Sequence, residues 1–262
     1  MEKQKRQKKI LEFIRANSAA TVADLCESFQ VSEMTIRRDL AELDEAGLLR
    51  RVHGGATLGT GRSNEPTYRA RALENHEAKQ AIAALAASLV ADGDSIALDV
   101  GTTIHEMVSP LKDRLDLTIL TPSLSIANSL LEVFRPNSGM RLMLTGGIVR
   151  QDEKSLIGEY AQSMYRNLNV DKAFLGVGAL NIKEGFTEYN LDDAAVKKAM
   201  LCSAEKVYFL ADGSKFGRST FASVAPLSTA TAILTDSSAS QAIISQIQAM
   251  GVEVIVAPSP LP

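Results

Sequence analysis

The chain has 262 residues, of which 45% are hydrophobic, 23% charged and 5% aromatic. This composition is typical of a globular protein and excludes a disordered, collagen-like or coiled-coil chain. The net charge of −3 excludes a uniformly basic surface for nucleic acid. Residues 1–60, however, hold ten Lys and Arg against nine Asp and Glu, so a local basic surface near the N-terminus fits the count.

The two cysteines and the apolar segments indicate a cellular compartment. Cys26 and Cys202 lack metal-ligand spacing and each lies in an apolar run, so we expect buried, reduced thiols and no metal site. No apolar segment of signal-peptide length follows the basic N-terminus, and the longest apolar stretch, residues 81–91, is shorter than a membrane span. The sequence therefore predicts a cytoplasmic protein without a cofactor or a membrane partner.

The first fifty residues predict three short helices. Apolar residues recur at helical spacing over residues 5–16, and Thr21 with Asp24 resembles a capping box that begins a second helix. Ser32 is a good N-cap for a third helix, which Gly47 ends. The short break before Ser32 is typical of a helix-turn-helix motif.

A small hairpin and a linker follow the three helices. Residues 48–52 are compatible with a strand, and Gly54 with Gly55 supplies a turn, which together predict a wing beside the helix-turn-helix. Residues 57–64 are small, polar and rich in glycine, as expected of a linker.

From Ser95 onward, short apolar runs alternate with helical segments. Several runs are apolar at consecutive positions, as in strands that are buried on both faces of a sheet. The predicted strands are residues 95–99, 117–120, 140–144, 173–177, 207–210, 232–234 and 252–256, and the main helices are 76–91, 104–111, 123–134, 191–203 and 239–250. This alternation predicts a mostly parallel α/β sheet with helices on both faces. The chain thus divides into a winged helix-turn-helix domain over 1–57, a linker over 58–74 and an α/β domain over 75–262.

The third predicted helix has the layout of a DNA-reading helix. In a helix-turn-helix, the second helix of the motif lies in the major groove and its N-terminal residues meet base edges, where Arg pairs with guanine or with phosphate. The predicted DNA contacts are Ser32, Glu33, Met34, Thr35, Arg37, Arg38, Arg50, Arg51 and His53, and Lys3, Lys5 and Arg6 add candidate phosphate contacts. Composition alone leaves open a helical oligomerisation or protein-binding module with a solvated basic face.

Polar and glycine-rich residues follow the predicted strands of the α/β domain. In an open parallel sheet, ligands bind beyond the carboxyl ends of the strands. Glycine lets backbone amides approach an anion, and helix N-termini at Thr102 and Ser123 favour negative charge. Candidate charge donors to a phosphate are Arg150, Lys154 and Lys215, and candidate acceptors from sugar hydroxyls are Asp99 and Asp212. The set suits a small phosphorylated sugar or polyol.

Each of these residues alone has an ordinary structural explanation. Gly, Ser and Thr after strands are common turn residues. Lys197 and Lys198 lie on a polar helix face and are expected in solvent, and His76 and His105 are isolated from metal-like partners. The repetition of the same chemistry after several strands is what favours a ligand site.

Several sequence strings resemble those of one protein family. The stretch 21–56 contains VSEMTIRRDL at 31–40 and RVHGGA at 51–56, and closely resembles the DNA-binding domain of bacterial transcription regulators of the DeoR (deoxyribose operon repressor) type. The strings GTT at 101–103, LTGG at 144–147, DKAFLGVGAL at 171–180 and ADGSKFG at 211–217 resemble the sensor-domain motifs of that family. The resemblance covers about residues 3–256.

The resemblance implies a winged helix-turn-helix that binds double-stranded operator DNA, and a sensor domain with a fold similar to ribose-5-phosphate isomerase. It also implies a phosphorylated intermediate of a sugar pathway as the effector. Carried onto this chain, the effector contacts are Asp99, Gly101, Thr102, Thr103, Thr121, Ser123, Gly146, Gly147, Arg150, Lys154 and Lys215. Pro122 stands where the family commonly has Asn, and Gly213 where it commonly has Ser, so the identity of the ligand stays open.

Three functions fit the sequence to different degrees. The favoured one is a non-enzymatic repressor of a carbohydrate catabolic operon, whose effector shifts a dimer or tetramer to a geometry that misplaces helices on half-sites about 34 Å apart. The second is an enzyme similar to a sugar-phosphate isomerase with an accessory DNA-binding module, in which Asp99, Asp212 and Lys215 do acid–base work. The third is an adaptor whose basic helix binds acidic partners.

Overall fold

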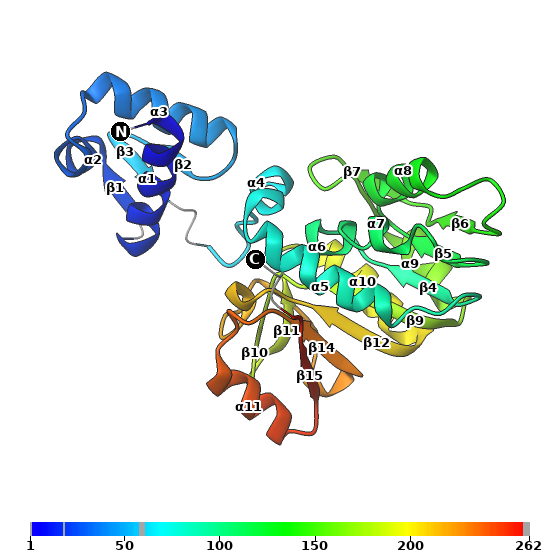
Figure 1. Ribbon diagram of the computed structural model, residues 1–262. Helices are drawn as coiled ribbons and strands as arrows, with labels where there is room; N and C mark the ends of the chain where they lie inside the picture. The colour runs from blue at the N-terminus through cyan, green and yellow to red at the C-terminus, as the bar shows by residue number, and fades with distance from the viewer. Residues whose placement is uncertain (1, 18, 58–60, 259–262) are drawn as a thin grey trace. The chain divides into compact units, whose positions relative to one another are not determined.

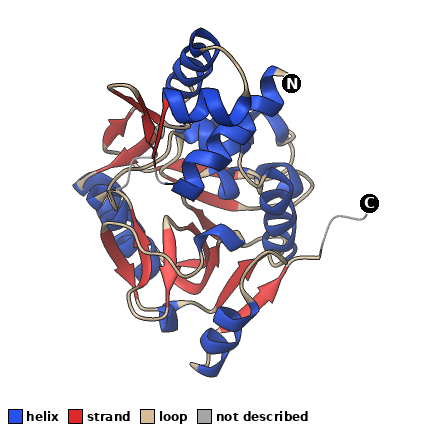
Figure 2. Cartoon of the chain, turned by 90° about the vertical axis from the view of Figure 1, so that its left-hand side faces the viewer, coloured by secondary structure: helices blue, strands red, loops and turns tan. Residues whose placement is uncertain are grey.

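The computed structural model divides the chain into two compact units, Met1–Glu74 and Asn75–Pro262 (Figure 1). It describes residues 2–17, 19–57 and 61–258. The first unit contains α1–α4 and β1–β3, and the second contains the large sheet with its covering helices (Figure 2).

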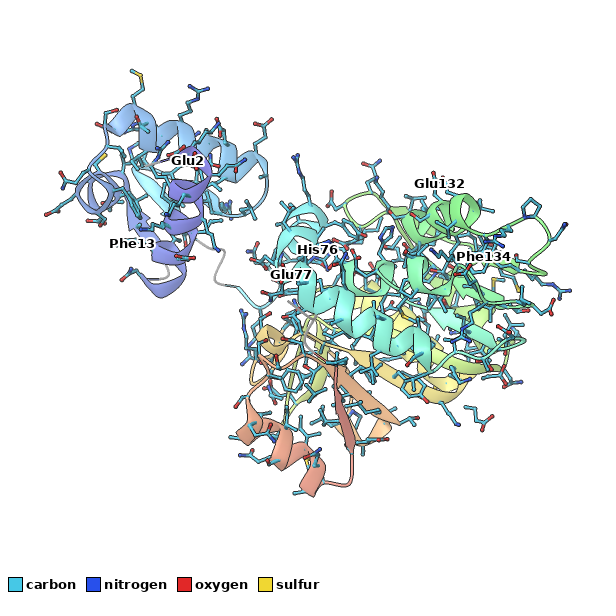
Figure 3. The ribbon with its side chains drawn as sticks, in the orientation of Figure 1. Glu2, Phe13, His76, Glu77, Glu132 and Phe134 are labelled. Carbon is cyan, nitrogen blue, oxygen red and sulfur yellow. The ribbon has the colours of Figure 1, made fainter. Side chains whose placement is uncertain are left out.

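The first unit has the predicted helices and wing. Its helices are α1 (Lys3–Asn17), α2 (Val22–Phe29), α3 (Glu33–Glu45) and α4 (Tyr68–Leu73), and its strands β1 (Ala19–Thr21), β2 (Arg50–Val52) and β3 (Gly55–Thr57) pair antiparallel in the order β1-β3-β2. Ile14, Leu25 and Ile36 are fully buried between the first three helices. Phe13 of α1 meets Phe29 of α2 edge to face, with ring centroids 6.1 Å apart (Figure 3). The predicted winged helix-turn-helix is confirmed.

Local polar contacts set the ends of these helices. Thr21 Oγ1 accepts from the Asp24 amide at 3.1 Å, and Asp24 Oδ2 accepts from the Thr21 amide at 2.9 Å, which confirms the capping box. Gln30 ends α2 in the left-handed conformation, with φ of 53°. Ser32 Oγ then accepts from the Thr35 amide at 3.4 Å and begins α3. The turn between α2 and α3 is therefore encoded by a few adjacent residues.

The segment predicted as a linker contains a helix. Residues 58–60 lie outside the described residues. Thr67 caps α4, and its hydroxyl donates to the carbonyl of Ala46 at 3.0 Å. A Cβ on Gly47, whose φ is 67°, would come within 2.1 Å of Thr67 Cγ2, so glycine is required where the chain leaves α3. The sequence did not predict α4, because six residues are too few to show a helical period.

Seven described strands of the second unit form one parallel sheet in the order β15-β14-β12-β9-β4-β5-β6. They are β4 (Ser95–Leu98), β5 (Thr118–Thr121), β6 (Arg141–Leu144), β9 (Val170–Gly176), β12 (Ala204–Leu210), β14 (Ala232–Thr235) and β15 (Glu253–Val256). Each overlaps a predicted strand, so the parallel α/β prediction is confirmed. The chain runs from β4 through β5 to β6 and returns to β9 on the other side of β4. The topological switch point therefore lies between β4 and β9.

Helices cover both faces of this sheet. One face carries α5 (His76–Ser88), α6 (Thr102–His105), α7 (Val108–Leu111) and α8 (Leu124–Val133), and the other carries α9 (Glu159–Arg166), α10 (Leu191–Ser203) and α11 (Gln241–Ala249). Along β9, Phe174 belongs to one core cluster and the next residue, Leu175, to the other. This is the arrangement expected of consecutive apolar residues in a strand that is covered on both faces.

Short antiparallel elements lie outside the predicted pattern. A hairpin of β7 (Ile148–Arg150) and β8 (Ser155–Ile157) follows β6, and β10 (Ala179–Asn181), β11 (Gly185–Glu188) and β13 (Ala222–Ala225) form a small sheet in the order β10-β11-β13. These strands mix polar and apolar residues over three or four positions, and they lack the regular alternation with helices by which the equally short strands of the large sheet were predicted.

The two cysteines differ in exposure. Cys26 is partly buried, but Cys202 is exposed on α10, so the expected burial of Cys202 is wrong. Among the described residues, no helix combines the length and the apolarity that crossing a membrane requires.

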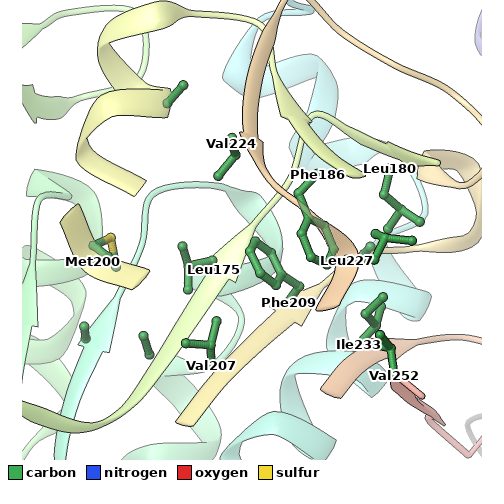
Figure 4. Close-up of a cluster of buried hydrophobic side chains, with 14 of the residues drawn as sticks. Leu175, Leu180, Phe186, Met200, Val207, Phe209, Val224, Leu227, Ile233 and Val252 are labelled. Carbon is green, nitrogen blue, oxygen red and sulfur yellow. The ribbon is translucent and has the colours of Figure 1, made fainter. Parts of the chain in front are cut away.

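The core beneath the small sheet is built around an aromatic pair. Phe209 of β12 stacks on Phe186 of β11, with ring centroids 3.5 Å apart and planes 13° apart (Figure 4). Both side chains are fully buried and belong to one cluster with Leu175 and Ile233. The pair therefore joins the small antiparallel sheet to the large parallel one.

Replacing Phe209 tests this role. Phe209→Ala should lower the free energy of unfolding by about 3–5 kcal/mol, because it removes a buried ring and leaves a cavity. Phe221, which is 57% exposed, gives a matched control, and Phe221→Ala should change the value by about 0.5 kcal/mol or less. Urea denaturation followed by circular dichroism measures both. Equal losses in the two variants would contradict the packing described.

Candidate functional site

The predicted DNA contacts gather on α3 and the wing of the first unit. Ser32 caps α3, the next five predicted residues lie in its first two turns, Arg50 and Arg51 lie in β2, and His53 lies in the turn that follows. The exposed residues of the set are Ser32, Glu33, Met34, Arg37, Arg38, Arg50, Arg51 and His53, and Thr35 is half-buried. The predicted residues thus form one surface of the domain.

The outward stripe of α3 lies opposite its core face. Ile36 and Leu40 are buried against the other helices. At about 100° per residue, Met34 and Arg38 lie on the far side of the helix from them. Met34 is 82% exposed and the Arg38 side chain 78% exposed. These two residues therefore form the prominent edge of the helix.

We call α3 the reader helix. Its two arginines both have acidic neighbours. Arg37 donates from Nε and Nη2 to Glu33 Oε1, at 2.9 and 2.5 Å. Arg38 Nε lies 3.4 Å from Glu42 Oε1. Exposed i,i+4 pairs of this kind are weak and exchange readily for a stronger partner. The arginines are thus positioned along α3 without being locked in place.

Arg6 has a different environment from the one expected. Its guanidinium donates to the buried carboxylate of Asp39, with Nε 2.5 Å from Oδ2, and only 12% of its side chain is exposed. The hydrogen bond that Arg6 donates to Asp39 raises the pKa of Arg6. Arg6 therefore ties α1 to α3, contrary to the phosphate contact that we expected. Lys3 likewise donates to Glu42, at 2.8 Å.

The wing is fixed beside the reader helix by backbone contacts. The Arg51 amide donates to Asp44 Oδ1 of α3 at 3.0 Å, and the Val22 amide donates to the carbonyl of Gly54 at 2.9 Å. A Cβ on Gly55 would lie 2.2 Å from the carbonyl oxygen of Ala20, so the hairpin needs glycine there. Wing and reader helix thus form one rigid surface.

The predicted effector residues lie at the carboxyl edge of the parallel sheet. After β4 come Asp99, Gly101, Thr102 and Thr103. Thr121 ends β5 and Ser123 follows it, and after β6 come Gly146 and Gly147. The β7–β8 hairpin contains Arg150 and Lys154, and the short helix η1 (Gly213–Lys215) after β12 contains Lys215. Because the strands are parallel and β4, β5 and β6 are neighbours, most of these residues are brought to one edge.

A buried cation occupies the switch point itself. Lys197 Nζ of α10 donates to Asp99 Oδ2 and to the carbonyl of Gly176 at 3.0 Å, and lies 3.3 Å from Glu188 Oε2. The Gly176 amide donates back to Asp99 Oδ2 at 3.0 Å. Lys197 was expected in solvent, and this expectation is wrong, since its side chain is 3% exposed.

The charges at the switch point stabilise one another. Burial alone lowers the pKa of Lys197, but the carboxylates of Asp99 and Glu188 outweigh it and hold that pKa above its ordinary value. Burial raises the pKa of Asp99, and Lys197 opposes this shift. Tyr165 of α9 is also buried beside this charge, and burial followed by the Asp99 carboxylate raises its pKa. The two carboxylates therefore favour the charged form of Lys197.

Several predicted effector residues already have partners in the protein. Thr121 Oγ1 accepts from the Ser123 amide at 3.1 Å, and Ser123 Oγ accepts from the Ile126 amide at 3.2 Å as the cap of α8. Arg150 forms an ion pair with Asp193 at the start of α10. These groups shape the edge of the sheet, and a ligand would have to share or displace their partners.

The acceptor proposed after β12 is also engaged. Asp212 Oδ1 accepts from the Ser214 amide at 3.0 Å and from Asn75 Nδ2 at 2.9 Å, and the Asp212 side chain is buried. Asp212 therefore holds η1 in place and ties it to the start of α5.

Among the described residues, four buried hydroxyls have no hydrogen-bond partner: Thr235 Oγ1 at the end of β14, and three toward the β4–β6 end of this edge. These three are Thr145 Oγ1 directly after β6, Ser155 Oγ in β8 and Tyr165 OH in α9. Buried hydroxyls are nearly always paired with protein or with water. Sequence analysis noted Thr145 after its strand without assigning it a contact, and it missed Ser155 and Tyr165, together with Lys197, Glu188 and Asp193.

A winged helix-turn-helix joined to an open α/β sheet with a polar switch point defines a ligand-responsive transcription regulator. The model of the DeoR-like helix-turn-helix domain matches residues 6–61, and that of the DeoR C terminal sensor domain matches residues 74–237. The chain belongs to the DeoR family.

Named relatives agree with this assignment, and a solved structure is similar over part of the chain. The transcriptional repressor AccR of Agrobacterium fabrum is 36% identical over 89% of this chain and 90% of its own. The glycerol-3-phosphate regulon repressor of Escherichia coli is 30% identical over 90% of this chain and 92% of its own. The ribose 5-phosphate isomerase A of Methanocaldococcus jannaschii is 19% identical over 55% of each chain, with a TM-score of 0.39, which is a partial likeness in fold.

Replacing Lys197 tests the buried charge network. Lys197→Met should lower the free energy of unfolding by about 3–5 kcal/mol, because Asp99 and Glu188 would remain buried without their cation. Lys198→Met, on the exposed side of the same helix, should change it by about 0.5 kcal/mol or less. Urea denaturation measures both. Restored stability in Lys197→Met combined with Asp99→Asn and Glu188→Gln would support the electrostatic cause, and a neutral Lys197→Met would refute it.

Proposed function

We propose that this protein represses a carbohydrate catabolic operon in the cytoplasm and is released from its operator by a phosphorylated sugar or polyol. The observation that carries the proposal is the prominent edge of α3. There Met34 and Arg38 project into solvent, while the apolar residues on the opposite face of the helix are buried in the core of the domain. The match to a sensor-domain model in the same chain supports control by a small ligand.

The DNA contacts that we propose are the nine residues of α3 and the wing. In this arrangement the first turns of α3 enter the major groove, and the wing lies along the phosphate backbone. Those residues are Ser32, Glu33, Met34, Thr35, Arg37, Arg38, Arg50, Arg51 and His53. Their gathering on one exposed surface supports the assignment.

The effector contacts that we propose lie at the carboxyl edge of β4, β5 and β6. Gly101, with φ of 123°, and Gly147, with φ of 134°, hold backbone conformations that bring amides close to an anion. Lys154 and Lys215 supply charge to a phosphate, and the buried hydroxyls of Thr145, Ser155 and Tyr165 are suited to sugar hydroxyls. The remaining members of the proposed set are Asp99, Thr102, Thr103, Thr121, Ser123, Gly146 and Arg150.

A role in sensing without catalysis agrees with the engagement of the charged groups. A general base needs a free lone pair within reach of its substrate. Lys197 is held as a cation by Asp99 and Glu188, and Asp99 Oδ2 accepts from both Lys197 and Gly176. The relative from Escherichia coli is named for a glycerol-3-phosphate regulon, which supports a phosphorylated small molecule as ligand.

Repression requires more than one copy of the chain, so we propose a dimer or tetramer. Two reader helices bind half-sites that are one helical turn, about 34 Å, or a multiple of it apart. The effector shifts the equilibrium between the DNA-binding geometry and the released geometry, and it does so only by as much as its affinity for the two states differs.

The experiment that tests this function is a gel shift with the promoter region of the chain's own gene. Binding should be strong at low salt and should be released by one member of a panel of sugar and polyol phosphates. Failure to bind that DNA at low salt would reject the repressor function.

Arg38 is expected to carry much of the DNA affinity. Arg38→Ala should weaken operator binding more than about tenfold, because an arginine pair with guanine or phosphate is worth about 1–3 kcal/mol. The melting temperature should not change, since the side chain is 78% exposed. Gel-shift titration measures the affinity, and an unchanged value would remove Arg38 from the interface.

Lys215 is expected to act on the effector alone. Lys215→Ala should leave operator affinity unchanged and abolish release by the effector, because the lost charge faces the phosphate. Lys206 lies near the amino end of β12, away from the carboxyl edge of the sheet. The effector should therefore release Lys206→Ala from DNA normally. Normal release of Lys215→Ala would discard its assignment.

A further inference from the structure

The reader helix α3 carries a strongly exposed apolar side chain in its first turn. Met34 is the second residue of α3 and is 82% exposed, the highest value among the exposed large hydrophobic residues described. It lies on the far side of the helix from Ile36, and Arg38 follows one turn later on the same stripe. A charged or polar residue is the usual occupant of such a position.

Folding does not account for Met34. The core cluster of this domain, as far as the structure describes it, does not include Met34. An apolar side chain in water contributes nothing to the burial that stabilises the fold. Single exposed apolar residues are common on protein surfaces. Met34, however, stands in the first turn of α3, the part of a DNA-reading helix that meets base edges, so it is placed to contact DNA.

The neighbours of Met34 are already engaged in polar contacts. Glu33 accepts from Arg37, and Thr35 Oγ1 lies 2.9 Å from Ser32 Oγ. These contacts fix the first turn of α3 and leave Met34 to project between them. Its unbranched side chain adapts to a small apolar target more easily than a β-branched one.

The major groove offers one apolar group on the edges of the bases, the C5 methyl of thymine. We propose that Met34 selects a thymine in each operator half-site by packing against that methyl group. The proposal rests on the placement of α3 in the major groove and adds to it the chemistry that one position reads.

Deoxyuridine tests this directly, because it differs from thymidine only by the methyl group. Operator DNA is first selected by the full-length wild-type chain from random duplexes. Each thymine of the two half-sites is then replaced by deoxyuridine, one position at a time. At one thymine per half-site, the replacement should weaken wild-type binding about fourfold, as expected for the loss of one buried methyl group.

Two variants complete the test. Met34→Ala should bind the thymine and deoxyuridine duplexes equally at that position, within about 1.5-fold, because the coupled partner is missing. Its melting temperature should match that of the wild type. Val52→Ala, which truncates a 49% exposed residue of the wing, should retain the fourfold effect.

The outcomes separate this proposal from the DNA-reading function. If no thymine shows a methyl effect, or if Met34→Ala shows the same effect as the wild type, then Met34 does not read thymine, although the chain still binds operator DNA. If the wild-type chain enriches no sequence, the DNA-reading function and this proposal are both overturned.

Discussion

The buried ammonium of Lys197 is the interaction on which the second unit depends. A cation in the interior costs several kcal/mol, on the order of what a whole domain gains from folding, unless it is fully paired. Here Nζ reaches Asp99 after β4, the carbonyl of Gly176 in β9 and the carboxylate of Glu188 in β11. One side chain from α10 thereby joins the two strands at the switch point to the small sheet. A ligand that binds beyond those strands, as we propose, meets a floor whose parts are fixed relative to one another.

The sequence predicted elements whose signals are local or long. The helix-turn-helix followed from a capping box at Thr21 and a cap at Ser32, in which side chains a few residues apart satisfy the helix ends. The parallel sheet followed from apolar runs that are buried on both faces, as Phe174 and Leu175 are. The helix α4 and the antiparallel strands of the second unit were not predicted, because three to six residues of mixed polarity show no period and, unlike the wing, these strands are not marked by an adjacent Gly-Gly turn.

The site was predictable in place but not in pairing. Strand ends rich in Gly, Ser and Thr indicated one edge of the sheet, and the structure brings these residues to that edge because the strands are parallel. Lys197 was assigned to solvent because its helix carries several charges. Yet Asp193, Lys197 and Met200 fall on one helical stripe, and all three are buried. The signal for burial was the helical spacing that puts both charged residues on one stripe with the apolar Met200, and their counter-charges after β4 and on β11 could come only from the fold.

The reader helix follows a different electrostatic design from that of the switch point. Its arginines are exposed and matched with Glu33 and Glu42, and the whole chain has a net charge of −3. Exposed pairs hold their partners weakly, so DNA can replace them at small cost. Because its arginines are paired with carboxylates and the chain is acidic overall, the protein has a weaker general attraction for DNA phosphates than a basic protein has, and this attraction supplies most of the sequence-independent affinity of DNA-binding proteins. A larger share of operator affinity must then come from contacts with base edges, and an apolar contact such as that of Met34 gains in importance because salt does not screen it. The same few residues of α3 would therefore set both the strength and the selectivity of binding.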